Sequence, residues 1–321
     1  MEINTLYTVD SRWEYYVKSK EEFIENYVLI ARFHKEVPED IVDAFETVTH
    51  LLAYSYYHWP MLDEATSKGL LIVEMALKLK AKQLDMDLDV TDKRGRTQQK
   101  RLVDLINEIF SLPHLSFLKP DFERARKLRN SKMHPDQHSY MGAIGRPKSN
   151  AMLFANIINH LFLPQASLEQ LLKTRKQFEI GMSNFKTGLF VIERDDKKHL
   201  FDTIHFHRYC TAGENELLAL LFNPVLKNVS ACLSQHDFPV PLMVFLREFV
   251  IKDLTIEGVD IENRPVKIYP TEKEQNILAQ ESYYEDLKSV SPHDMQGYHA
   301  YLSGKVLWAT EQVVHDQIWT N

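Results

Sequence analysis

Cysteine is scarce in this chain of 321 residues, which contains only Cys210 and Cys232. Two cysteines cannot build the disulfide framework of a small secreted domain, and such sparing use is typical of a reducing cytoplasm. Glycine is also rare, with 10 residues, whereas phenylalanine and tyrosine number 17 and 14. Many aromatic residues and few glycines favour large packed cores over disorder. We therefore expect a folded, cytoplasmic protein without disulfides.

No apolar stretch approaches the roughly 20 residues that a transmembrane helix requires. The segment Met1-Glu2-Ile3-Asn4 also lacks the charged and apolar regions of a secretory signal, so we expect no membrane partner. Three common catalytic patterns are missing as well: the glycine-rich phosphate loop, the Gly-x-Ser-x-Gly elbow and the His-Glu-x-x-His helix. An NTPase, a serine hydrolase and a zincin therefore lack sequence support, and we expect no cofactor.

Positive charge is in deficit, since the formal net charge is −7. A nucleic-acid partner would therefore need a local basic patch. Residues 93–101 and 119–132 each supply one, with the basic residues Lys93, Arg94, Arg96, Lys100 and Arg101, and then Lys119, Arg124, Arg126, Lys127, Arg129 and Lys132. The alternative is that both segments are ordinary solvated helix faces.

Apolar residues at helical spacing predict a series of helices between residues 38 and 163. Prolines separate them, and the helix near residues 61–86 is apolar almost all round, as expected of a helix buried between neighbours. The expected helices cover about residues 38–58, 61–86, 97–110, 120–135 and 149–162. Together they predict a compact antiparallel helical bundle.

The pattern changes after residue 178, where short alternating stretches predict strands at residues 188–194, 199–209 and 249–269. Helical patterns return at residues 274–288 and 304–319. We expect a mainly α protein with an α+β C-terminal part, in which a helical bundle precedes a smaller mixed α/β domain. The expected parts are a helical N-terminal extension (1–37), the bundle (38–175) and an accessory sensor or partner-binding domain (176–321).

The most informative segment is Leu128-Arg129-Asn130-Ser131-Lys132-Met133-His134-Pro135, at the end of a predicted helix. Arginine presents a rigid fork of donors to phosphate, and histidine exchanges a proton near neutral pH. Arg129 and His134 are five residues apart, about 140° around a helix, so they do not share a face. Asn130 and His134 do share one. Pro135 places His134 at or just beyond the last helical turn.

Arg129-Asn130-x-x-x-His134, with this order of helices, resembles the hallmark motif of the HEPN superfamily. The resemblance covers about residues 38–163 and implies a bundle that forms a homodimer, with the two motifs meeting across a cleft. It also implies metal-independent cleavage of RNA, as in the catalytic members. The RNA 2′-hydroxyl would attack the adjacent phosphate, with His134 as general acid or base and Arg129 stabilising charge on the phosphoryl oxygens. Asn130 would orient the histidine.

The same resemblance assigns partners and supporting residues. RNA would be held by the basic residues around the motif, which are Arg124, Arg126, Lys127 and Lys132. Glu74 interrupts an apolar helix and needs a partner if it is buried, so it is expected behind the motif as a support for one of the basic residues. Catalytic HEPN proteins serve in antiviral defence and as toxins, so a regulatory protein or an antitoxin is a further expected partner.

Several alternatives stay open at this point. The alternative to the catalytic interpretation is a non-catalytic HEPN-like module that dimerises and binds a nucleotide, RNA or a protein. Separately, Arg129 and His134 would serve only as helix caps if the motif were a coincidence. His138 is a second candidate proton carrier, and Glu74 would face solvent if it lay at the bundle edge. His205 and His207, with Asp202 and Cys210, would form a metal site or a surface for single-stranded RNA, although no typical zinc spacing follows and we expect no metal.

Overall fold

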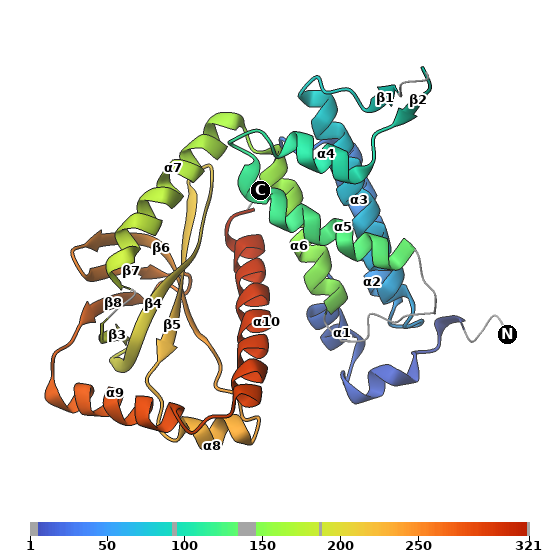
Figure 1. The fold of residues 1–321 in the computed structure, drawn as a ribbon. Coiled ribbons are helices and arrows are strands. Elements are labelled where there is room, and N and C mark those ends of the chain that lie inside the picture. The colour runs from blue at the N-terminus through green and yellow to red at the C-terminus, as the bar shows by residue number, and fades with distance from the viewer. Residues whose placement is uncertain (1–5, 92–94, 134–145, 186–187, 320–321) are drawn as a thin grey trace. The chain divides into compact units, whose positions relative to one another are not determined.

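The structure is a computed structural model that describes residues 6–91, 95–133, 146–185 and 188–319. The chain separates into two compact units, drawn in Figure 1. The helical unit comprises residues 1–169 and 319–321, and the barrel unit comprises residues 170–318. Helix α7 (Gln165–Gly181) contains the point at which the chain passes from the first unit to the second.

The helical unit is built from the helices that the apolar periodicity predicts. They are α1 (Lys20–Tyr27), α2 (Glu39–Tyr54), α3 (Met61–Gln83), α4 (Leu102–Ile109), α5 (Lys119–Met133) and α6 (Arg146–Phe162), with short 3-10 turns at Ser11–Tyr15 and Ser116–Leu118. Pro38 and Pro60 precede α2 and α3, and acidic residues occupy the first turns, where they favour helix initiation. Helix α3 contacts α2, α4, α5 and α6, so it forms the centre of the unit.

One expectation within this unit is wrong. Residues 97–99 were predicted to begin a helix, but they form strand β2 (Thr97–Gln99), which pairs antiparallel with β1 (Asp89–Thr91). All six strand residues are exposed. The polar sequence there contains no apolar stripe to hold a helix against the bundle, and α4 begins only where Leu105 and Ile106 are buried.

The N-terminal segment packs into the same core. Trp13 and Phe23 are fully buried, with their rings 4.7 Å apart. The indole Nε1 of Trp13 donates a 2.8 Å hydrogen bond to the carbonyl oxygen of Ser55, just after α2. Residues 11–27 thus belong to the helical unit through their aromatic side chains.

The barrel unit corrects the expected fold class. Six antiparallel strands, β3 (Phe190–Arg194), β4 (Lys197–Ala212), β5 (Asn215–Pro224), β6 (Leu242–Lys252), β7 (Thr255–Asp260) and β8 (Pro265–Pro270), close into a barrel when β3 pairs with β8. Helices α8 (Val229–Ser234), α9 (Glu274–Leu287) and α10 (Pro292–Gln317), with a 3-10 turn at Met182–Phe185, complete the unit. The prediction of a smaller mixed α/β domain is therefore wrong.

The composition of strand β5 explains why the sequence pattern does not predict the barrel. Its centre, residues 217–222, is a continuous apolar run, and periodicity alone cannot separate a fully buried strand from a buried helix over so short a length. The sequence pattern also does not indicate that the sheet closes into a barrel, because the pairing of Phe190 with Pro270 joins residues far apart in the sequence. The interior is filled by aromatic and branched side chains such as Phe201, Leu218 and Ile268. Closure leaves the barrel without a free edge strand.

Candidate functional site

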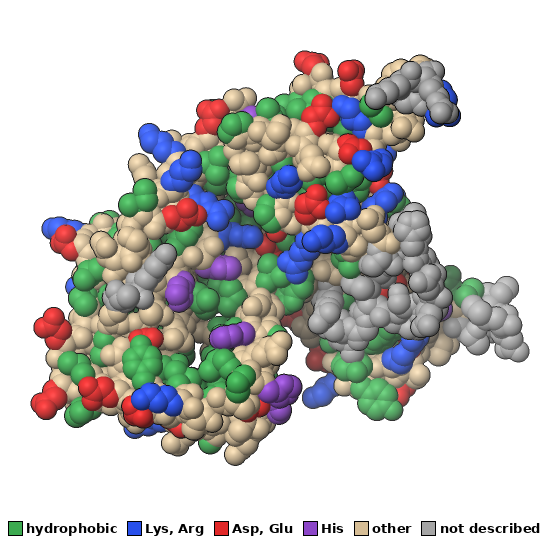
Figure 2. All heavy atoms as spheres, in the orientation of Figure 1, with side chains coloured by type: hydrophobic (Ala, Val, Ile, Leu, Met, Phe, Trp, Pro, Cys, Tyr) green, Lys and Arg blue, Asp and Glu red, His purple; other side chains and the backbone are tan. Residues whose placement is uncertain are grey.

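Helix α5 carries the motif residues, and its apolar side positions them. Phe122 and Ala125 are buried, and the Phe122 ring lies 4.9 Å from that of Phe110, just after α4. This packing turns the opposite side of α5 outward, where Arg124, Lys127 and Asn130 are exposed. Figure 2 shows lysine and arginine side chains gathered over this region, with some acidic side chains among them. The exposed side of α5 is therefore a local basic patch on an acidic protein.

Arg129 lies on the side of α5 that faces α3, beside Glu74. Its Nε is 2.9 Å from Oε2 of Glu74, and Lys78 places its Nζ 2.9 Å from Oε1 of the same carboxylate. The Arg129 and Glu74 side chains are 27% and 18% exposed, so the pair is largely shielded from water. The Nε–H does not point along the line of a hydrogen bond, so the contact is an ion pair. Glu74 and Arg129 are 55 residues apart in the sequence, so no local sequence pattern predicts their pairing.

The two ion pairs place the carboxylate of Glu74 between α3 and α5. The side chain does not lie at a solvent-exposed edge; it holds two cations, one of which is the motif arginine. Nε–H is one of the five N–H donors of a guanidinium, and the other four are on the two terminal nitrogens that form the fork. The carboxylate of Glu74 holds the guanidinium of Arg129 beside α3 through an ion pair at Nε.

The other predicted residues divide into three groups. Arg126 pairs with Glu123, its Nη2 lying 2.8 Å from Oε2, so its charge is partly neutralised. Arg124 and Lys127 are exposed and three residues apart, so they share a side of α5. His134 and His138 lie outside the described residues, as does the side chain of Lys132, so the contact expected between Asn130 and His134 stays a prediction.

The histidines of strand β4 do not form the expected shared face. The pairing of β4 with β5 shifts between Phe206 and Arg208, so His207 sits in a bulge and the alternation of side chains breaks there. His205 is exposed, and its Nε2 lies 3.3 Å from the hydroxyl of Thr203. Burial, reinforced by the nearby Arg208, lowers the pKa of His207 to about 4, so it is neutral at pH 7.

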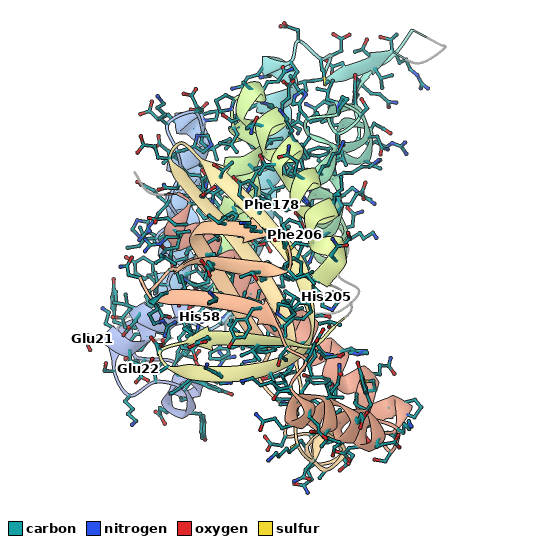
Figure 3. All side chains as sticks on the ribbon, turned by 90° about the vertical axis from the view of Figure 1, so that its left-hand side faces the viewer. Glu21, Glu22, His58, Phe178, His205 and Phe206 are labelled. Atoms are coloured by element: carbon teal, nitrogen blue, oxygen red, sulfur yellow. The ribbon has the colours of Figure 1, made fainter. Side chains whose placement is uncertain are left out.

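The aromatic side chain between these histidines is already covered. Phe206 stacks on Phe178 of α7 with their ring centroids 6.3 Å apart, and Figure 3 shows the two beside each other. Phe178 also contacts Tyr209 and Phe249. The surface suggested for stacking single-stranded RNA is therefore occupied by α7. Among the residues that the structure describes, no group of three His, Cys, Asp or Glu side chains is arranged to hold a metal ion.

Sequence reasoning missed a buried polar cluster on α6. Asn156, Asn159 and His160 are at most 6% exposed, and Trp319 contributes its indole to the same cluster. The side chain of Asn159 donates to the carbonyl of Arg32 at 2.8 Å. Buried polar groups need hydrogen-bond partners, so three such residues within an otherwise apolar helix were a signal that other segments pack there.

Comparison of the chain with protein-family models, with curated proteins and with solved structures found no match in any of the three. Within the described part of the chain, no helix is long and apolar enough to cross a membrane. Arg129 and its surroundings are consequently the features of the protein that indicate a function.

Proposed function

We propose that this protein is a metal-independent endoribonuclease of the HEPN type. The observation that carries the proposal is the largely buried ion pair between Arg129 and Glu74, on a basic helix and five residues before His134. Arg129 lies on the side of α5 toward α3, and Arg124 and Lys127 are exposed on the same helix. The positioned arginine suits contact with a phosphodiester, and the exposed cations on the other side of α5 add positive charge to the helix that carries it.

The proposed reaction needs only proton transfer and charge stabilisation. The 2′-oxygen of the RNA loses its proton to a histidine base and attacks the adjacent phosphorus. The bond from phosphorus to the 5′-oxygen breaks, and that oxygen takes a proton from a histidine acid, leaving a 2′,3′-cyclic phosphate. Arg129 stabilises the charge that grows on the phosphoryl oxygens. His134 supplies the proton carrier, and Asn130 sets its orientation.

A second copy of the chain is part of the proposal. One His134 cannot be base and acid in the same step, so two motifs facing each other in a homodimer would divide the two roles between them. The formal charge of −7 opposes nonspecific attraction of RNA, so recognition would depend on the α5 patch and weaken as salt rises. A role in antiviral defence or growth arrest, restrained by a regulatory protein or an antitoxin, is proposed with this activity.

The deciding experiment measures cleavage of labelled RNA in the presence of EDTA. Wild type should cut, whereas Arg129→Ala and His134→Ala should each lose at least about a hundredfold in rate, the usual contribution of such groups. Arg12→Ala is the matched control, because Arg12 is an arginine of the same unit that pairs with Asp10 and belongs to neither basic segment. Undiminished cleavage by both motif variants would contradict the proposal. RNA or nucleotide binding by a dimer without any cleavage would favour the non-catalytic module instead.

A further inference from the structure

A pocket of about 160 Å³ opens on the barrel unit, between strands β3, β4 and β8 and the first turn of α9. Its floor is apolar. Val191 pairs with Leu200 on one side and with Tyr269 on the other, and cross-strand partners project from the same face of a sheet. The next residues along, Ile192 and Ile268, belong to the barrel core. The pocket therefore lies on the outside of the barrel, over three adjacent strands.

The wall of the pocket is fixed by a turn that leads into α9. The backbone N–H of Thr271 donates to the carbonyl oxygen of Leu189 at 2.8 Å, which continues the pairing of β8 with β3. The Thr271 hydroxyl then accepts hydrogen bonds from the Asn276 side chain at 2.9 Å and from the Lys273 backbone at 3.4 Å. These bonds hold the start of α9 against the strands, so the pocket is formed without a ligand.

The lining of the pocket is positively charged. Lys198, His199 and Lys273 line it, and none of the described residues in the lining is Asp or Glu. Just outside the lining, Glu193 places Oε2 3.2 Å from Nζ of Lys198 and accepts a 3.2 Å hydrogen bond from the Tyr269 hydroxyl. The pair is exposed to solvent, so Glu193 neutralises the positive charge of Lys198 only in part.

The start of α9 adds to this charge but does not carry the argument. Lys273 is the residue that precedes the helix, and no side chain caps the first N–H groups there. Those groups carry a partial positive charge, which Glu274 in the first turn offsets to some degree. Lys198, Lys273 and the enclosed volume are the features of the pocket that suit an anion.

We propose that this pocket binds the phosphate group of a small phosphomonoester, such as a nucleoside monophosphate. Two ammonium groups complement a dianionic phosphate, and the floor of Val191, Leu200 and Tyr269 accepts the adjacent sugar or base. The volume is below the roughly 300 Å³ at which drug-sized ligand sites begin, which favours a phosphate with one attached group over a dinucleotide. The site lies on the barrel unit, far in sequence from Arg129, so binding there does not depend on RNA cleavage.

The phosphate could belong to a free nucleotide or to the 5′ end of an RNA, and titration calorimetry with the full-length protein distinguishes the two. Adenosine 5′-monophosphate, adenosine and inorganic phosphate form the first set of ligands. Short RNAs with a 5′-phosphate or a 5′-hydroxyl form the second. We expect heat of binding from the monophosphate and none from adenosine, with inorganic phosphate weaker than the monophosphate. Binding of the 5′-phosphorylated RNA that is tighter than that of both the 5′-hydroxyl RNA and adenosine monophosphate would identify the RNA end as the source.

Variants on the exposed rim test the assignment without disturbing the fold. Lys198→Ala and Lys273→Ala should each weaken binding about tenfold, the effect of losing one charge-assisted hydrogen bond. Lys267→Ala is the matched control, because Lys267 is on β8 but pairs with Glu257 and does not line the pocket. Equal binding of adenosine and its monophosphate, equal loss in the control, or no binding of any phosphate at about 1 mM ligand would overturn the proposal. Calorimetry measures binding alone, so each of these outcomes is independent of whether the protein cleaves RNA.

Discussion

The indole Nε1 of Trp319 donates a 2.8 Å hydrogen bond to Oδ1 of Asn156, which lies 163 positions earlier on α6. Both residues are 1% exposed, and the ring of His160 meets the indole edge-on at 4.9 Å. His34 belongs to the same cluster, because its Nε2 lies 2.8 Å from the carbonyl oxygen of Asn159. Trp319 follows the barrel unit directly in sequence, yet its side chain completes the core of the helical unit.

This relationship predicts a graded loss of stability. Trp319→Ala removes a fully buried ring and should lower the free energy of unfolding by about 3–5 kcal/mol. Trp319→Phe keeps much of the ring but removes the N–H, so Asn156 loses this donor and about 1–3 kcal/mol is expected. Denaturant unfolding followed by tryptophan and tyrosine fluorescence measures both. A Phe variant as stable as wild type would mean that the hydrogen bond contributes nothing.

Glu74→Gln should impair the proposed cleavage by releasing Arg129 while leaving the motif residues in place. We expect the rate constant for cleavage to fall about tenfold or more, with RNA affinity changed much less, because Glu74 acts through Arg129 and does not touch the RNA. Glu74→Asp should recover part of the rate. Glu108→Gln is the control, since Glu108 pairs with Lys100 elsewhere in the same unit. If the control and Glu74→Gln reduce the rate equally, Glu74 has no positioning role.

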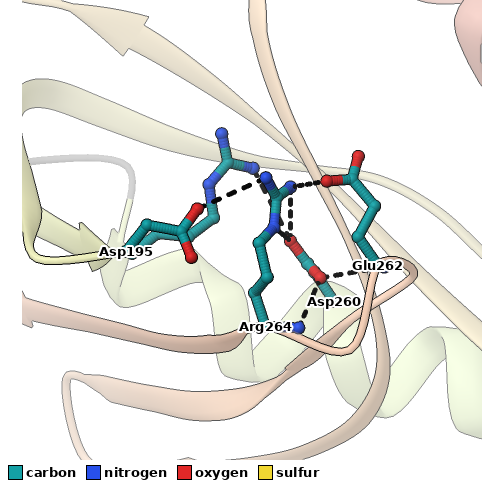
Figure 4. A network of polar contacts seen from close by, with 5 residues as sticks. Asp195, Asp260, Glu262 and Arg264 are labelled. Atoms are coloured by element: carbon teal, nitrogen blue, oxygen red, sulfur yellow. Dashed lines mark hydrogen bonds and ion pairs between the residues drawn. The ribbon is translucent and has the colours of Figure 1, made fainter.

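Asp260 should make the barrel unit less stable in acid. Burial raises the pKa of this carboxyl, but hydrogen bonds from the Arg264 backbone and side chain and from the Glu262 backbone, each 2.9 Å long, outweigh burial and lower the pKa overall. Figure 4 shows this network, in which Arg264 also contacts Asp195. Because the folded pKa lies below the unfolded one, the stabilisation is complete above the unfolded value and is lost as pH falls through the folded value.

The test of this linkage is a comparison of unfolding at neutral and acidic pH. Asp260→Asn should cost about 1–3 kcal/mol at pH 7, where wild type has the full charge-assisted network. The difference between wild type and variant should shrink as pH falls below 3.8, the ordinary pKa of an aspartate. A difference that stays constant across this range would show that the charge of Asp260 is irrelevant to stability.

Gly69 allows α3 and α6 to approach closely. A Cβ at this position would lie 2.7 Å from Cδ2 of Phe154, which is buried. Gly69→Ala should therefore destabilise the helical unit by about 1–3 kcal/mol through overpacking, despite the better helix propensity of alanine. Gly304→Ala is the matched control on α10, where nothing lies within 4 Å of the added atom. The control should leave stability unchanged or raise it by up to about 1 kcal/mol, as thermal unfolding can measure.

The candidate site was predictable from the sequence only in part. The chemistry of Arg129 and the presence of a basic helix follow from residue type and local spacing. The partner of Glu74 was foreseen as a basic residue near the motif, but only the packing of α5 on α3 identifies it as Arg129. The pocket on the barrel unit was not foreseen, because its lining comes from strands and a turn that meet only when β3 pairs with β8.

The sequence by itself determined the helices of the first unit and the first hairpin of the second. Pro60 begins α3 at Met61, and Asp195 and Asp196, both with positive φ, form the two-residue turn between β3 and β4. These features depend on residues close together in the chain. Only the tertiary structure decided the closed barrel, the pairing of Glu74 with Arg129 and the burial of Trp319 against Asn156. Each depends on surfaces brought together from distant segments, where burial and hydrogen bonding outweigh local preference.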